Sequence, residues 1–164
     1  GPGRLGILIL FIASLKKIKT ISVSRSEAKR NRALDFGAQY SFSPENAVDE
    51  VKNITEGLGA DLVVDTTGHP DGITQAMNLV QPRGTIACKT TCGLPATEID
   101  MTKLVVDEIT LQGSRCGPFK DALEIIQTHQ KKLKSLITSI HPLEETQIAL
   151  ESATKENKVV LNIN

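Results

Sequence analysis

Short strand-like runs alternate with helix-like stretches along this chain of 164 residues, and this alternation constrains the fold more than any other feature. The runs at residues 20–24, 61–65, 85–89 and 109–112 are rich in β-branched and apolar side chains. Strands that alternate with helices over short connections are typical of a parallel sheet with helices on both faces. The sequence therefore predicts a doubly wound α/β domain.

Glycines and prolines set the boundaries of the expected helices. Gly37 follows one of them, and glycine is favoured just after a helix C-terminus because it adopts positive φ without strain. A turn is expected at residues 82–84, before the third strand. The expected helices of this region cover residues 5–15, 27–36, 47–56, 72–79 and 104–107.

The strict alternation ends after Gly117. Beyond it we expect helices over residues 119–131 and 143–154 and a closing strand over residues 158–163. The chain is therefore divided into a domain over residues 1–117 and a C-terminal segment over residues 118–164.

The first six residues contain the pattern Gly-x-Gly-x-x-Gly, formed by Gly1, Gly3 and Gly6. Such a loop holds the pyrophosphate of a dinucleotide where it joins a strand to a helix. Here an apolar helix follows, but no strand precedes the loop, so the central first strand of the sheet is missing. Three explanations of the missing strand are open: the sheet closes up, another chain covers the gap, or the chain is a fragment of a longer protein. A start inside a phosphate loop favours the fragment. The alternative interpretation of the three glycines is a flexible N-terminal stub.

The residues at the end of the strand 20–24 indicate which dinucleotide is preferred. A carboxylate there accepts hydrogen bonds from the adenosine ribose and repels a 2′-phosphate. This chain has Ser24, Arg25 and Ser26 instead, followed one helical turn later by Lys29 and Arg30. Hydroxyls and cations suit a phosphate dianion, and arginine presents a planar fork of donors. NADP(H) is therefore favoured over NAD(H); a solvated helix start is the alternative interpretation.

Composition argues against several other classes. Nineteen basic residues balance 19 acidic ones and aromatic residues make up only 3%, so no nucleic-acid partner is expected. The apolar stretch 5–15 is too short to cross a bilayer, and no membrane association is expected. Cys88, Cys92 and Cys116 form an odd set of cysteines, which favours free thiols in a reducing cytoplasm.

Five stretches in this order resemble the cofactor-binding half of the medium-chain dehydrogenase/reductase family, which includes the zinc-type alcohol dehydrogenases. They are GPGRLG, SVSRSEAKRNRALDFGA, GLGADLVVDTTGHP, LVQPRGTIA and VDEITLQGSRCGPF. The resemblance covers essentially the whole chain and implies a Rossmann-like parallel sheet without its first strand. It also implies that residues 118–164 return toward a catalytic domain that this chain lacks.

The resemblance further implies which residues contact the dinucleotide. Arg4 and Leu5 lend backbone amides to the pyrophosphate at the start of the first helix. Thr67 and Gly68 line the adenosine-ribose side, and the loop around Lys89 approaches the nicotinamide ribose. The full implied set, in which Ser114 and Cys116 hold the carboxamide through their backbone, is Gly1, Gly3, Arg4, Leu5, Gly6, Ser24, Arg25, Lys29, Thr67, Gly68, Lys89, Thr90, Ser114 and Cys116.

The activity implied by the resemblance is hydride transfer between NADP(H) and an alcohol/carbonyl pair. The family's zinc ligands and proton-relay hydroxyl belong to its catalytic domain, so no catalytic or metal-ligating residue is expected here, and this chain alone is expected to be inactive. Two alternatives stay open: a non-catalytic dinucleotide-binding or dimerisation module, and a relative of the zinc-free quinone reductases. The resemblance also implies that the strand from Ile109 to Gln112 lies at a sheet edge, where pairing with a second copy would give a homodimer or a tetramer.

Overall fold

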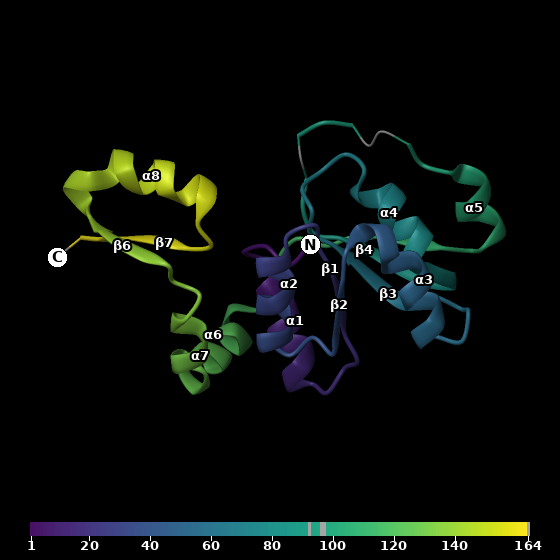
Figure 1. Cartoon of the computed structure of the whole chain (residues 1–164), viewed down its shortest axis with the longest axis horizontal. Coiled ribbons are helices and arrows are strands. Elements are labelled where there is room, and N and C mark those ends of the chain that lie inside the picture. The colour runs from purple at the N-terminus through teal and green to yellow at the C-terminus, as the bar shows by residue number, and fades with distance from the viewer. Residues whose placement is uncertain (92, 96–97, 164) are drawn as a thin grey trace. The chain divides into compact units, whose positions relative to one another are not determined.

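The computed structural model describes residues 1–91, 93–95 and 98–163. Contacts between Cα atoms divide the chain into two compact units, Gly1–Arg115 and Cys116–Asn164. In Figure 1 the first unit runs from purple to green and the second from green to yellow. Each unit is described by itself below.

The first unit alternates helices and strands, as the sequence predicts. Its elements are α1 (Gly6–Leu15), β1 (Ile21–Val23), α2 (Glu27–Asp35), β2 (Tyr40–Phe42), α3 (Pro44–Ile54), β3 (Ala60–Asp65), α4 (Gly72–Leu79), β4 (Val80–Cys88), α5 (Met101–Val106) and β5 (Thr110–Gly113).

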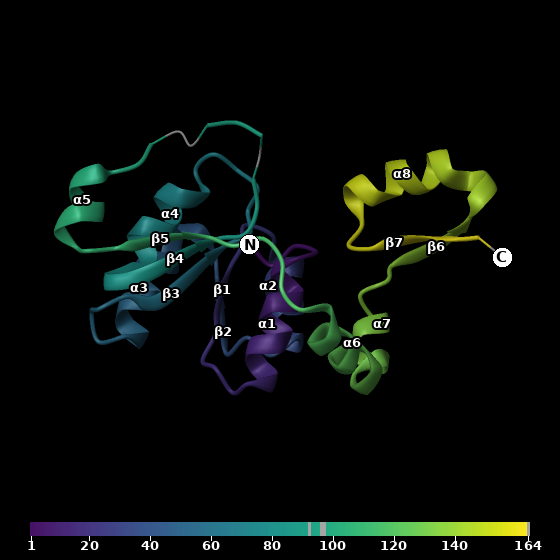
Figure 2. The same cartoon turned by 180° about the vertical axis from the view of Figure 1, so that it is seen from behind.

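Every strand pair in this unit is parallel. β1 pairs with β2, and β3, β4 and β5 form a separate three-stranded sheet in that order. Within this second sheet Val63 lies opposite Ile86, and Ile86 lies opposite Leu111. Figure 2 shows β5 beside β4. The predicted α/β class with parallel sheets is confirmed.

One hydrophobic core cluster of the first unit lies where α4 packs on the β3–β4–β5 sheet. Ile86, in the middle strand, is fully buried, and Ala76 and Met77 of α4 are each 2% exposed. Val80 and Ile109 complete the buried cluster. This packing fixes α4 against the sheet and so fixes the loop that joins β3 to α4.

The region between β1 and β3 has uncovered apolar side chains. Leu62 on β3 is 56% exposed, although a continuous apolar run such as residues 61–65 is typical of a buried parallel strand. Helix α1 is apolar on all sides, yet Ile12 and Leu15 are 37% and 41% exposed. A buried parallel strand needs a neighbour on each side, and among the described residues no strand joins β1 to β3.

Two local differences from the sequence prediction have simple causes. Strand β2 was not expected, because three residues carry too short an alternation to be recognised. The expected turn at residues 82–84 is instead an irregularity within β4, where Arg83 has φ +63° and the pairing with β3 shifts register.

The second unit is a small α/β arrangement that contains α6 (Phe119–Thr128), α7 (Gln130–Lys134), β6 (Ser139–Pro142), a short 3-10 helix (Leu143–Glu145), α8 (Thr146–Lys155) and β7 (Val159–Asn162). Strands β6 and β7 are parallel, with Ile140 opposite Val160. Leu136 and Ala149 are its buried apolar side chains. The sequence did not predict β6, because His141 and Pro142 indicated a break.

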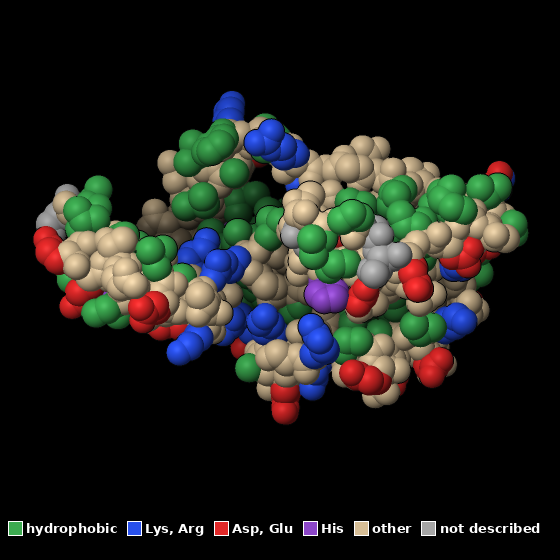
Figure 3. Space-filling view, turned by 90° about the horizontal axis from the view of Figure 1, so that it is seen from above, with side chains coloured by type: hydrophobic (Ala, Val, Ile, Leu, Met, Phe, Trp, Pro, Cys, Tyr) green, Lys and Arg blue, Asp and Glu red, His purple; other side chains and the backbone are tan. Residues whose placement is uncertain are grey.

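The surface carries charges of both signs, as the balanced composition requires. Figure 3 shows basic (blue) and acidic (red) side chains on the face seen from above, with apolar side chains between them. Among the described residues, no helix has the length and apolar character that crossing a membrane requires.

Replacement of Ile86 by alanine is expected to lower the free energy of unfolding by about 2–5 kcal/mol, because it leaves a cavity in the packed core. Leu62→Ala is the matched control, since Leu62 is mostly exposed, and it is expected to cost about 1 kcal/mol or less. Urea unfolding followed by far-ultraviolet circular dichroism measures both. Equal losses would show that Leu62 is covered in solution.

Candidate functional site

The glycine loop folds tightly at the start of α1. The Gly3 amide donates to the Gly1 carbonyl at 2.9 Å, and the Ile7 amide donates to the Gly3 carbonyl at 3.0 Å. A Cβ atom at Gly6 would collide with the Gly1 carbonyl oxygen and lie 2.8 Å from Thr66 Oγ1. Glycine is therefore required at position 6, and the loop leads directly into a helix N-terminus, where backbone amides favour anions.

Thr66, which the sequence analysis did not select, joins this loop to the end of β3. Its hydroxyl donates to the Gly1 carbonyl at 2.6 Å, across 65 positions of sequence. A threonine directly after a strand is common, so no sequence signal distinguished it from its neighbour Thr67. In both views the N-terminus lies beside β1 and β4 (Figure 1 and Figure 2).

The turn between β1 and α2 places basic side chains near the glycine loop. The Ser26 hydroxyl caps α2 by accepting from the Lys29 amide, and Arg30 Nη1 donates to the carbonyls of Ser24 and Arg25 at 2.8 Å each. Arg30 therefore holds the turn, while the Arg25 and Lys29 side chains are exposed.

Two pKa shifts show that these cations act on their surroundings. Desolvation lowers the pKa of the Gly1 amino group, Asp65 opposes the shift, and the Lys29 charge lowers the pKa further. The pKa of Glu45, on α3, is lowered first by a hydrogen bond from Ser43 and then by the charges of Arg30 and Arg25, among other causes. The Lys29 charge is thus one of the causes that act on Gly1, and the charges of Arg30 and Arg25 are among those that act on Glu45.

The loops after β3, β4 and β5 hold one another through side-chain hydrogen bonds. Asp65 is 7% exposed and accepts from the Thr67 amide and hydroxyl at 2.9 and 2.8 Å. The Gly68 amide donates to Thr90 Oγ1 at 3.1 Å. Lys89 Nζ donates to Ser114 Oγ at 3.3 Å and to the Arg115 carbonyl at 2.9 Å.

The structure therefore brings together most of the residues that the sequence selected. Glycine-loop and β3-end residues meet at Thr66, and hydrogen bonds link the β3, β4 and β5 loops. Thr67, Lys89 and Thr90 bond to these loops through their side chains, so in this structure they shape the site. Cys116 is the first residue of the second unit and is not placed relative to the others.

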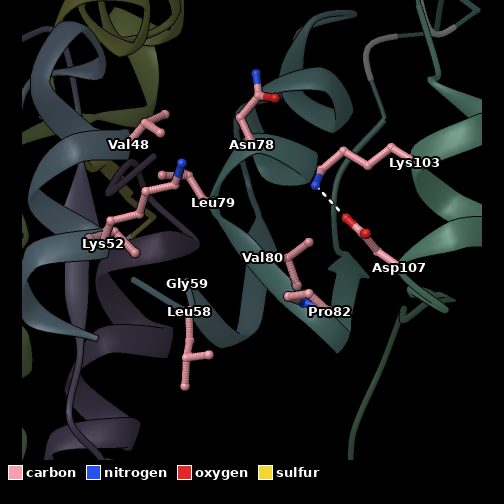
Figure 4. Close-up of a pocket in the computed structure, with 11 residues that line it drawn as sticks. Val48, Lys52, Leu58, Gly59, Asn78, Leu79, Val80, Pro82, Lys103 and Asp107 are labelled. Atoms are coloured by element: carbon pink, nitrogen blue, oxygen red, sulfur yellow. Dashed lines mark hydrogen bonds and ion pairs between the residues drawn. The ribbon is translucent and has the colours of Figure 1, made fainter. Parts of the chain in front are cut away.

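A cavity of about 460 Å³ lies elsewhere in the first unit (Figure 4). It is lined by the start of β4, including Val80 and Pro82, and by the ion pair between Lys103 and Asp107 at 2.5 Å. In parallel α/β sheets ligands bind beyond the carboxyl ends of the strands. The loops described above occupy that end, so we assign this cavity no part in the site.

Parallel strands, a glycine loop at a helix N-terminus and cations after the next strand are features of dinucleotide-binding domains. The sequence model of the family described as "Zinc-binding dehydrogenase" matches residues 5–130. The chain belongs to this family. Membership of a dehydrogenase family implies a nicotinamide dinucleotide as the cofactor.

Individual proteins that are similar to this chain are also dehydrogenases. L-threonine 3-dehydrogenase of Caldanaerobacter subterraneus is 31% identical over 174 residues, which cover 98% of this chain and 49% of that protein. L-threonine 3-dehydrogenase of Bacillus licheniformis is 28% identical over 171 residues, with the same coverage of 98% and 49%. The chain thus spans about half the length of these curated relatives.

Solved structures show the same fold. An alcohol dehydrogenase from Thermotoga maritima superposes with a TM-score of 0.87 at 24% identity, over 98% of this chain and 48% of that one. An alcohol dehydrogenase from Thermus sp. ATN1 gives a TM-score of 0.87 at 21% identity, over 100% of this chain and 49% of that one.

The family description implies a bound zinc ion, but the described residues of this chain do not provide a set of ligands for it. Within residues 1–91, 93–95 and 98–163, no group of three or more His, Cys, Asp and Glu side chains is arranged to hold a metal ion, whereas a catalytic zinc needs three converging protein ligands. Cys92 lies outside the described residues. We therefore derive no chemical step through zinc.

The Cys88 thiol, at the end of β4, provides a test of this region. Desolvation raises its pKa, and the nearby Asp65 carboxylate raises it further. A raised pKa leaves less thiolate, so at about pH 8 iodoacetamide is expected to modify Cys88 more slowly than the exposed Cys116. Asp65→Asn keeps an acceptor for Thr67 but removes the charge, so the pKa falls and modification of Cys88 accelerates.

Trypsin separates the three cysteines, because Cys88, Cys92 and Cys116 fall in the peptides GTIACK, TTCGLPATEIDMTK and CGPFK. Mass spectrometry of each peptide gives a rate for each thiol. An unchanged Cys88 rate in Asp65→Asn, with Cys116 as the internal reference, would contradict the electrostatic link between Asp65 and Cys88.

Proposed function

We propose that this chain binds NADP(H) at the ends of its parallel strands and forms the cofactor-binding part of an oxidoreductase that interconverts an alcohol and a carbonyl. The observation that carries the proposal is the glycine loop, which closes on Thr66 at a helix N-terminus. Residues 118–164 belong, in this proposal, to the part that returns toward the catalytic domain of a longer protein.

The glycine loop supports the binding of a pyrophosphate. Gly6 allows the start of α1 to pack against the Gly1 carbonyl, and a Cβ atom at Gly3 would meet nothing within 4 Å, so the backbone at Gly3 has open space beside it. The amides of Arg4 and Leu5 stand at the start of α1, where the helix dipole also favours negative charge. Arg4 is exposed and adds a positive side chain at the same point.

The basic turn after β1 supports NADP(H) rather than NAD(H). Arg30 fixes the backbone of Ser24 and Arg25, so the exposed Arg25 guanidinium starts from an ordered position. Position 24 carries a hydroxyl, which does not repel a 2′-phosphate. Two carboxylates oppose a second negative charge here: Glu45, which the charges of Arg30 and Arg25 reach, and Glu27 in the first turn of α2.

When bound, the nicotinamide supplies hydride transfer, and the residues of this chain bind and orient it. The glycine loop and Arg4 would hold the pyrophosphate, and Ser24 with Arg25 and Lys29 would hold the 2′-phosphate. The linked loops at Gly68, Thr90 and Ser114 would border the rest of the dinucleotide. Substrate contacts fall outside this proposal, because the chain spans only half of its relatives.

Titration with NADPH and with NADH, followed by the fluorescence of each cofactor, tests the proposal without interference from protein tryptophan. The chain is expected to bind NADPH more tightly. Arg25→Ala is expected to weaken NADPH binding by about ten-fold or more, since a charge-assisted phosphate contact is lost, and NADH binding by less than about two-fold.

Arg32→Ala is the matched control, because Arg32 lies on α2, the helix that follows the turn with Arg25, but in the last turn of that helix. It is expected to leave both affinities unchanged. Tighter binding of NADH than of NADPH would refute the 2′-phosphate assignment, and binding of neither would refute the proposed role of this chain on its own.

The β5 strand supports a second part of the proposal, a homodimer or tetramer formed through this edge. All four residues of β5 are exposed, and Leu111 is 43% exposed, whereas Ile109, which the sequence placed on the edge, is buried. The Ser114 amide donates to the Cys88 carbonyl on β4. Amides alternate in direction along a strand, so those of Leu111 and Gly113 point toward the free edge.

Leu111→Pro removes one edge-facing amide without removing a bond to β4, and it is expected to convert a dimer into a monomer. Leu111→Ala keeps the amide and is expected to stay dimeric. Light scattering coupled to size-exclusion chromatography measures the mass. A monomeric wild-type chain, or a dimer that Leu111→Pro leaves intact, would contradict pairing through β5.

A further inference from the structure

We infer that Thr66 is a positioning residue for the dinucleotide pyrophosphate: its hydroxyl fixes the glycine loop, without contact to the ligand. This inference rests on the proposed function. It names a role for a residue that the glycine pattern, the basic turn and the resemblance all leave unassigned.

The geometry places Thr66 at the point where two distant segments meet. Its Oγ1 donates to the Gly1 carbonyl at 2.6 Å, and the same carbonyl accepts from the Gly3 amide at 2.9 Å. One carbonyl oxygen thus holds both the internal turn of the loop and the link to β3. A carbonyl has two lone pairs, so the two donors satisfy it fully.

The position of Gly6 makes this link sensitive to small movements. A Cβ at Gly6 would meet both the Gly1 carbonyl oxygen and Thr66 Oγ1, so three segments are packed at the limit of contact. Because α1 begins at Gly6, a shift of the Gly1 carbonyl also shifts the first amides of the helix. The amides of Arg4 and Leu5, the donors proposed for the pyrophosphate, lie between Gly1 and Gly6, so the same shift changes their direction, on which anion binding depends.

Thr66 is itself anchored by the core. It directly follows Asp65, whose buried carboxylate accepts from the Thr67 amide and hydroxyl. β3 pairs with β4 up to the pair Asp65 and Cys88. The hydroxyl is therefore held by a rigid strand end, as an effective positioning group must be.

Three variants separate positioning from packing. Thr66→Val removes the hydroxyl and keeps the shape, whereas Thr66→Ser keeps the hydroxyl and removes a methyl group. Thr74→Val is the matched control, because Thr74 Oγ1 also donates to a distant backbone carbonyl, that of Glu98 at 2.7 Å, but on α4 and away from the glycine loop.

Two readouts are measured on the 164-residue chain. The first is amide hydrogen exchange at Gly3 and Ile7, followed by NMR, which reports the loop directly and needs no ligand. The second is titration with NADPH and NADH. Thr66→Val is expected to raise the exchange rate of both amides. It is also expected to weaken the binding of NADPH and of NADH equally, by about five-fold, as the loss of one hydrogen bond predicts. Thr66→Ser and Thr74→Val are expected to match the wild type in both readouts.

The outcomes distinguish this inference from the proposed function. If Thr66→Val leaves exchange at Gly3 and Ile7 unchanged, the inference is wrong, whatever the cofactor affinity. If exchange rises while NADPH and NADH bind as in the wild type, the loop is fixed by Thr66 but positioning for the ligand is refuted. If the wild-type chain binds neither cofactor, the proposed function fails, and so does the positioning of a ligand by Thr66.

Discussion

The close approach of three backbone segments at Gly6 is the constraint on which the candidate site depends. The glycine loop, the start of α1 and the end of β3 meet there without space for a single Cβ atom. This contact turns a short stretch of chain into an ordered helix N-terminus. Thr66 supplies the polar part of the contact, and the parallel pairing of β3 with β4 supplies its rigid support.

Charge at the site is arranged by the backbone as much as by side chains. In the sequence Arg30 is not distinguished from other surface cations. In the structure its guanidinium donates hydrogen bonds to the carbonyls of Ser24 and Arg25. The turn is thereby ordered while Arg25 and Lys29 stay exposed to a ligand. The charges of Arg30 and Arg25 contribute to the lowered pKa of Glu45 on α3, after a hydrogen bond from Ser43 as the largest cause.

The separation of the first unit into two sheets explains why several apolar side chains are exposed. Leu62, Ile12 and Leu15 are apolar and exposed, and they belong to β3 and α1, the elements that lie next to the glycine loop in the fold. Apolar side chains on such elements are normally buried. The uncovered surface agrees with a chain that spans about half the length of its curated relatives.

The sequence by itself determined most of the element order, the parallel α/β class, the glycine loop and the basic turn, because each of these is encoded in local periodicity or in a run of neighbouring residues. Strands β2 and β6 were not predicted, because a strand of three or four residues is too short to show a recognisable alternation of apolar and polar side chains. Only the tertiary structure decided that Thr66 meets Gly1, that Lys89 and Thr90 bond to neighbouring loops, and that Leu62 is uncovered. These facts depend on which strand ends come together in space, and a side chain's partner across 65 positions leaves no local trace in the sequence.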